Sequence, residues 1–581
     1  MFRYIDLLKE IFKVLTLKRR KNLTLIFFLL AVSGFLETLG IGLIIPLISE
    51  ILNSSTDIFS IKKLFYFKDL NRQSIIINLT ILIFFVYLFK GLYLTYLEFF
   101  IQKFSQSIRT EVSLKLYKKY INNRYELSVN SNSSILYRNI TTEASAFTTG
   151  VLEPVIMASK EFFIIFILLI FIVTINFKIS IFIIIFSLIF IKTVKILLSK
   201  HLEKMGFIQQ EMTGKENKII LESLQGIKII KAYNLEKVFY EKLKELAFNL
   251  ANVKAKINSI KLLPRIWIEL TLIIFLLLLA TSFTYFGYSL IEFMLFSSIF
   301  LISMLKIMPA IISLLKVINS FSHNKASIDL IKSEFSENTK NDLTNNFKDA
   351  SINQPYLLEF TKQFCCKKIA FKYLNSEEII KDLSFEINRK DDIIGIYGKS
   401  GSGKTTLVDI FIGLLNPSSG TFYIDGKEVN IKDYKHIFGY VPQTTFLFDD
   451  TIKNNILMTV KENLLISDKF LYEVLEKTQL IDLVNSLKDK ENTIIGENGT
   501  KLSGGQKQRI GIARALINKP KIMIIDEATN GLDKITEKKI FEDLKIISKN
   551  LSIIAVSHNP QIWGYCNKLF EMKNKNLIKI K

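Results

Sequence analysis

Six long apolar runs in the first 325 residues restrict what this chain folds into more than any other feature. Each run has about 20 residues or more, which is the length that an α-helix needs to cross the hydrocarbon core of a bilayer. They lie at roughly 23–50, 75–100, 154–176, 178–199, 264–286 and 289–318. The pattern predicts a membrane protein whose N-terminal part is an all-α domain of six transmembrane helices.

The composition excludes several other classes of protein. Hydrophobic residues make up 49% of the 581 residues, and Gly (24) and Pro (9) are too scarce for a disordered or collagen-like chain. The three cysteines, Cys365, Cys366 and Cys566, provide neither a disulfide framework nor a metal-ligand spacing. We expect them to be reduced thiols.

The distribution of basic residues predicts the orientation of the helices. The chain has 76 Lys and Arg against 54 Asp and Glu, a formal net charge of +22. The basic residues gather before the first run, between the second and third, and between the fourth and fifth. The positive-inside rule therefore places both termini in the cytoplasm. Because basic loops beside a membrane account for the surplus, we expect no nucleic-acid partner.

A change in the residue pattern divides the chain. We expect the transmembrane domain, with cytoplasmic extensions of its helices, at 1–330. A linker rich in Lys, Asn, Asp, Ser and Thr follows at 331–355, and an α/β domain occupies 356–581. The α/β domain carries the residues that indicate chemistry.

A strand-like run at 391–397 leads into a glycine-rich loop and then into an apolar helix. The loop and the start of the helix consist of Gly398, Lys399, Ser400, Gly401, Ser402, Gly403, Lys404, Thr405 and Thr406. In this context the pattern indicates a phosphate-binding loop, because the glycines let successive N–H groups curl around phosphates. We expect Lys404 to neutralise phosphate charge and the Thr405 hydroxyl to bind Mg²⁺.

A second apolar strand, at 522–525, ends in two acidic residues, Asp526 and Glu527. We expect Asp526 to hold Mg²⁺ directly or through water, and Glu527 to polarise the attacking water. A pair of solvated carboxylates at a strand end is the alternative interpretation.

Between these two motifs, Leu502 precedes the run Ser503, Gly504, Gly505 and Gln506. This LSGGQ run resembles the signature of ATP-binding cassette (ABC) ATPases, and the resemblance covers roughly 360–581. It implies an α/β P-loop ATPase that uses ATP and Mg²⁺. It also implies that the signature contacts the γ-phosphate of ATP held by the other subunit.

Four further residues match motifs of that family. The resemblance implies that Tyr373 stacks on adenine, and that Gln443 senses Mg²⁺ and contacts the membrane domain. It implies that Asp533 lies at the dimer interface and that His558 is the switch residue at the γ-phosphate. With Glu527 and an intact signature also present, a homodimer is expected to have two competent ATP sites.

Six predicted spans followed by one cassette resemble a half-transporter of the type I ABC exporter class. The resemblance implies a homodimer, because one chain cannot complete either ATP site; a different half-transporter as partner stays open. It also implies short coupling helices near 131–138 and 213–222. Residues 226–233 resemble the exporter segment that follows the second of these helices.

Three short patches in the membrane half resemble a more specific family, the PglK-type lipid-linked oligosaccharide flippases of bacterial N-glycosylation. They are Glu37-Thr38 with Pro46, residues 264–269 and residues 306–309. This resemblance implies a polyprenyl-diphosphate-linked glycan as substrate and a bacterial inner membrane as location, with the cassette in the cytoplasm. The alternatives are a multidrug or lipid A-type exporter and a subunit that binds ATP to regulate a partner without transport.

Charged residues inside the predicted spans are costly to bury and therefore mark candidate functional positions. They are Lys90, Arg265, Lys306 and Lys316. Together they are candidate ligands for an anionic head group of the substrate. The alternative is structural: Lys316 and Arg265 snorkel to the inner interface, and Lys90 pairs with Glu37 or Glu269.

Overall fold

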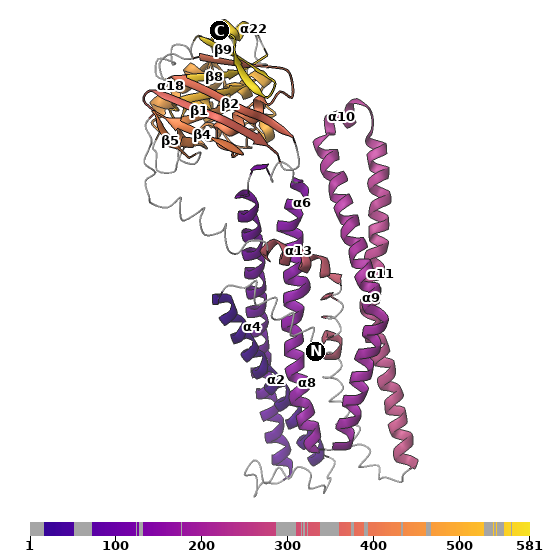
Figure 1. Ribbon diagram of the computed structural model, residues 1–581. Coiled ribbons are helices and arrows are strands. Elements are labelled where there is room, and N and C mark those ends of the chain that lie inside the picture. The colour runs from indigo at the N-terminus through magenta and orange to yellow at the C-terminus, as the bar shows by residue number, and fades with distance from the viewer. Residues whose placement is uncertain are drawn as a thin grey trace. The chain divides into compact units, whose positions relative to one another are not determined.

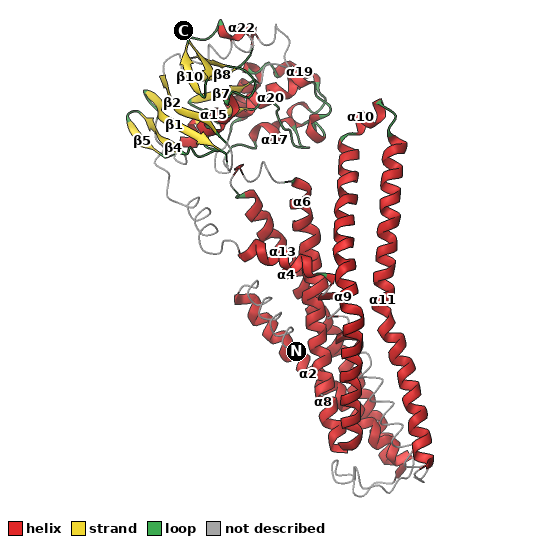
Figure 2. Ribbon diagram, turned by 45° about the vertical axis from the view of Figure 1, so that its right-hand side comes forward, coloured by secondary structure: helices red, strands yellow, loops and turns green. Residues whose placement is uncertain are grey.

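The computed structural model describes most of two compact units (Figures 1 and 2). The residues described are 17–51, 72–123, 125–126, 132–175, 177–285, 310–314, 317, 320–321, 323–336, 360–373, 377–388, 393–430, 434–460, 466–527, 538–539, 542, 551–558 and 560–581. The helical unit comprises 1–123 and 131–346, and the α/β unit comprises 124–130 and 347–581.

Long helices contain the first five predicted spans. They are α2 (Leu17–Ile51), α4 (Arg72–Ile121), α8 (Glu153–Ile175), α9 (Phe177–Gln225) and α11 (Glu236–Tyr285). The sixth predicted span lies mostly outside the described residues. Within the described part of the chain, Leu17–Ile44 and Gln73–Ile121 are long and apolar enough to cross a membrane. With 50 residues, α4 is about 75 Å long, so it extends well beyond a hydrocarbon core of about 30 Å.

Apolar side chains of the helical unit fall into a buried and an exposed set. Helix α2 packs on α4 and α8, and this contact buries Leu23, Ile26, Leu30, Leu97, Ile101, Val155 and Ile156 among others. The opposite face of α4 exposes Phe84, Phe85, Leu88, Phe89 and Leu92. An exposed apolar stripe of this length is unfavourable in water and suits contact with lipid.

The helix that leads into α8 alternates between α and π turns. Its elements are α6 (Ser133–Arg138), η2 (Asn139–Glu143), α7 (Ala144–Phe147) and η3 (Thr148–Leu152), of which η2 and η3 are π-helical. Within η3, the carbonyl oxygen of Gly150 accepts hydrogen bonds from Ser320 Oγ (2.5 Å) and Asn324 Nδ2 (3.4 Å). A Cβ at position 150 would lie 2.5 Å from Asn324 Nδ2, so this close approach requires glycine.

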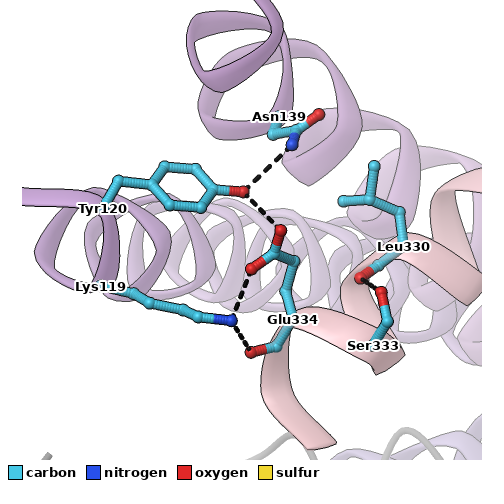
Figure 3. A network of polar contacts seen from close by, with 6 residues as sticks. All are labelled: Lys119, Tyr120, Asn139, Leu330, Ser333 and Glu334. Atoms are coloured by element: carbon cyan, nitrogen blue, oxygen red, sulfur yellow. Dashed lines mark hydrogen bonds and ion pairs between the residues drawn. The ribbon is translucent and has the colours of Figure 1, made fainter. Parts of the chain in front are cut away.

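Helix α13 (Lys325–Ser336) is fixed at its C-terminal end by a polar network, which Figure 3 shows. The ammonium group of Lys119 donates to Glu334 Oε2 (2.6 Å) and to the backbone oxygen of Glu334 (2.7 Å). The Tyr120 hydroxyl donates to Glu334 Oε1 (3.0 Å) and accepts from Asn139 Nδ2 (3.0 Å). The network joins α13 to α4 and η2.

A second polar contact fixes α13 near its start. Ser327 Oγ donates to Glu143 Oε2 (2.5 Å), and Gln210 Nε2 of α9 donates to the other oxygen of the same carboxylate (3.1 Å). The Glu143 side chain is buried, and its negative charge is compensated further by the Arg138 guanidinium group, whose Nε lies 3.4 Å from Glu143 Oε1. Helix α13 therefore continues to residue 336, whereas the sequence predicts a linker from residue 331.

We expect Tyr120→Phe to lower the free energy of unfolding by about 1 kcal/mol, because one hydroxyl serves both Glu334 and Asn139. The melting temperature of the detergent-purified protein measures this change. Tyr117→Phe is the matched control, because Tyr117 lies one turn earlier on α4 and is 52% exposed. Equal melting temperatures for the two variants would contradict a stabilising role of the network.

The predicted short helices are placed only in part. Helix α6 falls within the first predicted coupling segment, 131–138. The second predicted segment, 213–222, lies inside the long helix α9, so it is not a separate short helix. The short helix between α9 and α11 is α10 (Ile227–Ala232), because the chain leaves α9 at Gly226 and not before. Helix α10 falls within 226–233, the segment that the resemblance places after the second coupling helix.

The α/β unit contains two sheets. The strands are β1 (Gln363–Lys372), β2 (Glu378–Asn388), β3 (Ile393–Tyr397), β4 (Ser419–Ile424), β5 (Lys427–Val429), β6 (Phe438–Val441), β7 (Ile522–Asp526), β8 (Ser552–Val556), β9 (Lys568–Lys573) and β10 (Asn576–Lys579). The four-stranded sheet has the order β2-β1-β4-β5 and is antiparallel. The six-stranded sheet has the order β10-β9-β3-β8-β7-β6, and β9 to β6 run parallel.

Helices complete this unit. They are α15 (Lys404–Phe411), α17 (Ile452–Leu457), α18 (Asp468–Lys477), α19 (Ile481–Ser486), α20 (Gly504–Leu516) and α22 (Pro560–Trp563). Strands β7 and β8 are buried along their whole length, which explains why they are continuous apolar runs. Because the parallel strands all end at one edge of the sheet, the residues that follow β3, β6, β7 and β8 gather there.

Candidate nucleotide-binding site

The glycine-rich loop that follows β3 is tightly curled. Gly401 and Gly403 have φ of +78° and +100°, a left-handed conformation that favours glycine. A Cβ on Gly398 would lie 2.7 Å from the backbone oxygen of Met572. The Lys404 ammonium group, at the start of α15, donates to the carbonyl oxygens of Gly398 (2.8 Å) and Lys399 (3.1 Å).

The charged residues at this edge are largely buried. Lys404 is 7% exposed and Asp526 is 5% exposed. Burial lowers the pKa of Lys404, against the opposing effect of the nearby carboxylates of Glu527 and Asp526. Burial, together with the neighbouring Glu527 charge, raises the pKa of Asp526 to about 6. A cation at this position would relieve the repulsion between the two carboxylates.

Glu527 is held by two neighbouring strands. Its Oε2 accepts from Gln443 Nε2 (2.9 Å), and its Oε1 lies 3.1 Å from His558 Nε2. Gln443 follows β6 and His558 follows β8, so three predicted catalytic residues meet. Glu527 has φ of +50°, which is uncommon for a residue with a side chain and is typical of functional positions.

The residues at this edge fit a Mg²⁺–nucleotide. Ser402 Oγ is buried and has no hydrogen-bond partner among the described residues, so a polar group is missing beside the loop. The Thr405 side chain is exposed on the first turn of α15, in reach of a ligand at the helix N-terminus. Together with the buried Asp526, these groups offer the oxygens that Mg²⁺ prefers and the donors that phosphate needs.

Of the remaining predicted ligands, Tyr373 and Ser503 are described. Tyr373 follows β1 and packs edge-to-face on Phe371, with ring centroids 4.9 Å apart. Ser503 caps the N-terminus of α20 in a capping box: its hydroxyl accepts from Gln506 N, and its own N–H donates to Gln506 Oε1. The Ser503 contacts are thus with its own helix. Asp533 lies outside the described residues.

Family models match both units. A model described as "ABC transporter" matches residues 380–530. A model described as "ABC transporter transmembrane region" matches residues 23–325, which is more than half of the chain.

The chain belongs to the ABC transporter family.

Two relatives show how far the similarity of this ABC transporter extends. It is 40% identical to a putative export ATP-binding/permease protein of Rickettsia typhi, over 33% of this chain and 34% of that protein. It is 27% identical to a probable ABC transporter ATP-binding/permease protein of Haemophilus influenzae, over 65% of this chain and 67% of that one. The first match therefore spans about a third of the relative's length.

A solved structure shares the fold. The structure of a bacterial Atm1-family ABC exporter with ATP bound has a TM-score of 0.74 and 18% sequence identity. The match covers 96% of this chain and 94% of that chain. The expected fold class, a helical ABC exporter membrane domain followed by an α/β cassette, is confirmed, and the cassette of this family uses ATP with Mg²⁺.

The predicted substrate residues of the ABC transporter are described only in part. Lys90 of α4 is 6% exposed, forms an ion pair with Glu37 of α2, and lies 4.6 Å from the centroid of the Tyr87 ring. Arg265 lies in α11, but its side chain is not among those described. Lys306 and Lys316 lie outside the described residues. The structural alternative for Lys90, a pair with Glu37, is thus present.

One acidic residue near the site is absent from the sequence predictions. Asp409 of α15 is 6% exposed, and burial, with the nearby Asp526 charge, raises its pKa to about 6. The only signal in the sequence is an acidic residue within the apolar run of α15. Such a residue is usually placed on a solvated face, so this signal is weak.

We expect Asp526→Asn to stabilise the nucleotide-free protein above pH 7 by about 3 °C in melting temperature. Asp526 has a raised folded pKa, so folding favours its neutral form. The contribution of Asp526 to the unfolding free energy is therefore fully present below the unfolded pKa near 3.8 and is lost as pH rises through about 6. The amide stays neutral and avoids this loss.

Melting temperatures between pH 5 and 8, with and without Mg²⁺–ATP, measure the effect. Asp409→Asn is the control, because it removes a similar buried carboxyl while leaving Asp526 in place. It should keep the stabilisation by Mg²⁺–ATP that Asp526→Asn loses. If the Asp526→Asn variant is no more stable than the wild type at pH 8, the electrostatic argument is contradicted.

Proposed function

We propose that this ABC transporter is an ATP-driven exporter that acts as a homodimer in a bacterial inner membrane, with its cassette in the cytoplasm. The observation that supports hydrolysis is the Glu527 carboxylate, held between Gln443 and His558 beside the buried pair Lys404 and Asp526. A site that only bound ATP for regulation would not need a carboxylate held at both oxygens.

The chain's own residues divide the work. Bound ATP with Mg²⁺ supplies a γ-phosphate that transfers to water. Lys404, which donates to two backbone oxygens, would neutralise the phosphate charge, and Asp526, Thr405 and Gln443 would hold the metal. Glu527 orients and polarises water, with its oxygens fixed by Gln443 and His558. Fixing both oxygens before the reaction removes the cost of ordering the carboxylate during it.

The position of the signature supports the proposed homodimer. Ser503 caps an exposed helix N-terminus, and a Cβ on Gly504 would meet nothing within 4 Å. A helix N-terminus with open space attracts phosphate. In the family that the sequence resembles, this surface contacts ATP held by the other subunit, so two copies of this chain would form two such sites.

For the substrate, we propose a lipid-linked anion, such as a glycan on a polyprenyl diphosphate. The support is the set of basic residues in the predicted spans and the three patches that resemble PglK-type flippases. Arg265 suits bidentate contact with a diphosphate. The apolar stripe on α4 suits a substrate whose lipid tail stays in the bilayer while its head group crosses.

A multidrug or lipid A-type exporter is the second candidate, and one contact favours the multidrug form, whose substrates are uncharged. The ion pair between Lys90 and Glu37 neutralises the cation that lies deepest in the second span. A neutral pair attracts a diphosphate far less than a free ammonium group does. It leaves an apolar environment that accepts uncharged amphipathic molecules.

We expect Glu527→Gln to bind ATP with unchanged affinity while steady-state hydrolysis falls by at least about 100-fold. The amide keeps the side-chain size and one acceptor oxygen, but it cannot accept a proton from the attacking water. Phosphate release and equilibrium binding of a fluorescent ATP analogue measure the two quantities. Lys404→Ala is the contrasting variant, because it should weaken binding itself; turnover of Glu527→Gln near the wild-type rate would refute the assignment.

We expect Lys90→Gln to lower the unfolding free energy by about 3 kcal/mol, because it leaves the Glu37 carboxylate unpaired in an apolar region. The double variant Lys90→Gln/Glu37→Gln restores a neutral, hydrogen-bonded pair and should recover most of this stability. Melting temperatures of the two variants test this.

The double variant also separates the two substrate candidates. Reconstituted in liposomes with fluorescent lipid-linked glycans and apolar drugs, it should keep basal ATP hydrolysis and lose flipping of the diphosphate lipid. Wild-type flipping by a stable double variant would show that Lys90 has only a structural role. The general exporter would then be the better proposal.

A further inference from the structure

Arg514 lies near the C-terminal end of α20, the helix that Ser503 caps. Its guanidinium group donates to three oxygens: Asn455 O from Nε (2.8 Å), Phe446 O from Nη1 (2.9 Å) and Asn455 Oδ1 from Nη2 (3.1 Å). Burial lowers the pKa of Arg514, so the charge is held at a cost. Because the N–H groups of a guanidinium group point in fixed directions, these bonds fix both the distance and the angle between α20 and the residues that it contacts.

Asn455 of α17 is the second half of this contact. Its side chain is 1% exposed. Besides accepting from Arg514, Oδ1 accepts from Phe448 N (2.9 Å), and Nδ2 donates to Phe448 O (3.0 Å) and Thr451 O (3.1 Å). All the polar capacity of the amide is used, and two of its four hydrogen bonds hold the backbone at residue 448. We call the contacts of Arg514 and Asn455 with residues 446–448 the Arg514–Asn455 joint.

The joint holds the backbone of residues 446–448, which belong to the segment that starts at Gln443. Within this segment, Thr445 lies against α20 so closely that a Cβ on Gly511 would lie 2.5 Å from Thr445 Oγ1. Leu447 is fully buried in the same apolar core as Ile510 and Ala513. Segment 443–448 is therefore attached to α20 at successive points along its length.

The two ends of this assembly are the residues with proposed chemical roles. At one end, the Gln443 amide contacts Glu527. At the other, α20 is a 13-residue helix, a rod about 20 Å long, whose first turn is capped by Ser503. A displacement of segment 443–448 that the joint transmits would move Ser503 as well.

We propose that Arg514 is a positioning residue that couples Gln443 of one ATP site to Ser503, and so to the ATP site that Ser503 serves on the second copy. This inference rests on the proposed function, because it requires Glu527-dependent hydrolysis in a dimer. If Gln443 shifts when its amide oxygen reaches the metal, the joint would carry that movement along α20. Loss of the joint leaves each nucleotide bound but the opposite signature misplaced.

The first test is Arg514→Lys, which keeps the positive charge but offers one compact donor group in place of the fork. We expect the dissociation constant of a fluorescent ATP analogue to change by less than about twofold while kcat falls about 10-fold or more, because small misplacements of a catalytic surface are costly. The Hill coefficient for the dependence of hydrolysis on ATP concentration should fall from near two towards one, since the two sites no longer act together.

Asn455→Ala is the second variant, because it removes the side-chain part of the joint, the bonds of the Asn455 amide with Phe448, Thr451 and Arg514 Nη2, without touching the charge. It should reproduce the loss of kcat, and the double variant should be no slower than the slower single variant, since both act on one contact. Thr459→Ala is the matched control: the Thr459 hydroxyl donates to the backbone oxygen of Arg514 (3.2 Å) and lies outside the joint. It should keep kcat within about twofold of the wild type.

All assays are run well below each melting temperature, so that folded fractions are equal. If Arg514→Lys does not fold, Asn455→Ala carries the test alone. Wild-type kcat in the folded joint variants, or an equal loss of kcat in Thr459→Ala, would overturn the inference while leaving the exporter proposal intact. A wild-type protein without Glu527-dependent hydrolysis would overturn both.

Discussion

The parallel pairing of β9, β3, β8, β7 and β6 is the constraint on which the chemistry of this protein depends. Helices and loops cover both faces of these strands, so their interiors must be apolar, as the fully buried β7 and β8 are. Polar groups are therefore confined to the strand ends. Because parallel strands end at one edge, the loop after β3, Gln443 after β6, Glu527 after β7 and His558 after β8 share that edge.

Local sequence patterns predicted which residues form this site, but not the contacts between them. The glycine-rich loop is recognisable because strand, loop and helix are consecutive in the sequence, and the positive φ of Gly401 and Gly403 agrees with that interpretation. The hydrogen bond from Gln443 to Glu527 joins residues 84 positions apart, and it depends on the strand order. Asp409, Asn455 and Arg514 gave no usable signal, because their partners are backbone oxygens and charges that only tertiary packing brings near.

In the helical unit too, the sequence predicted local features but not tertiary contacts. The apolar runs predict where the helices α2, α4, α8, α9 and α11 lie, since length and hydropathy are local properties. The partner of Lys90 was open between Glu37 and Glu269, and the packing of α2 on α4 selects Glu37. The second predicted coupling segment is not a separate short helix, because α9 continues past Gly214 and ends only at Gln225. Helix propensity alone does not decide which of two glycines ends a helix.

The two π turns between residues 139 and 152 have a consequence for how this stretch can vary. Each π turn closes its hydrogen bond one residue later than an α turn does, so it contains an extra residue that shifts all later side chains around the axis by roughly 100°. That shift aims the Glu143 carboxylate at Ser327 and the Gly150 carbonyl at Ser320. Deleting one residue from either π turn would restore a regular α turn there and at the same time rotate the side chains that follow it away from their partners. In this chain, substitutions that keep the number of residues therefore leave the helix phase intact, whereas insertions and deletions do not, although the stretch contains no loop and no residue of the ATP site.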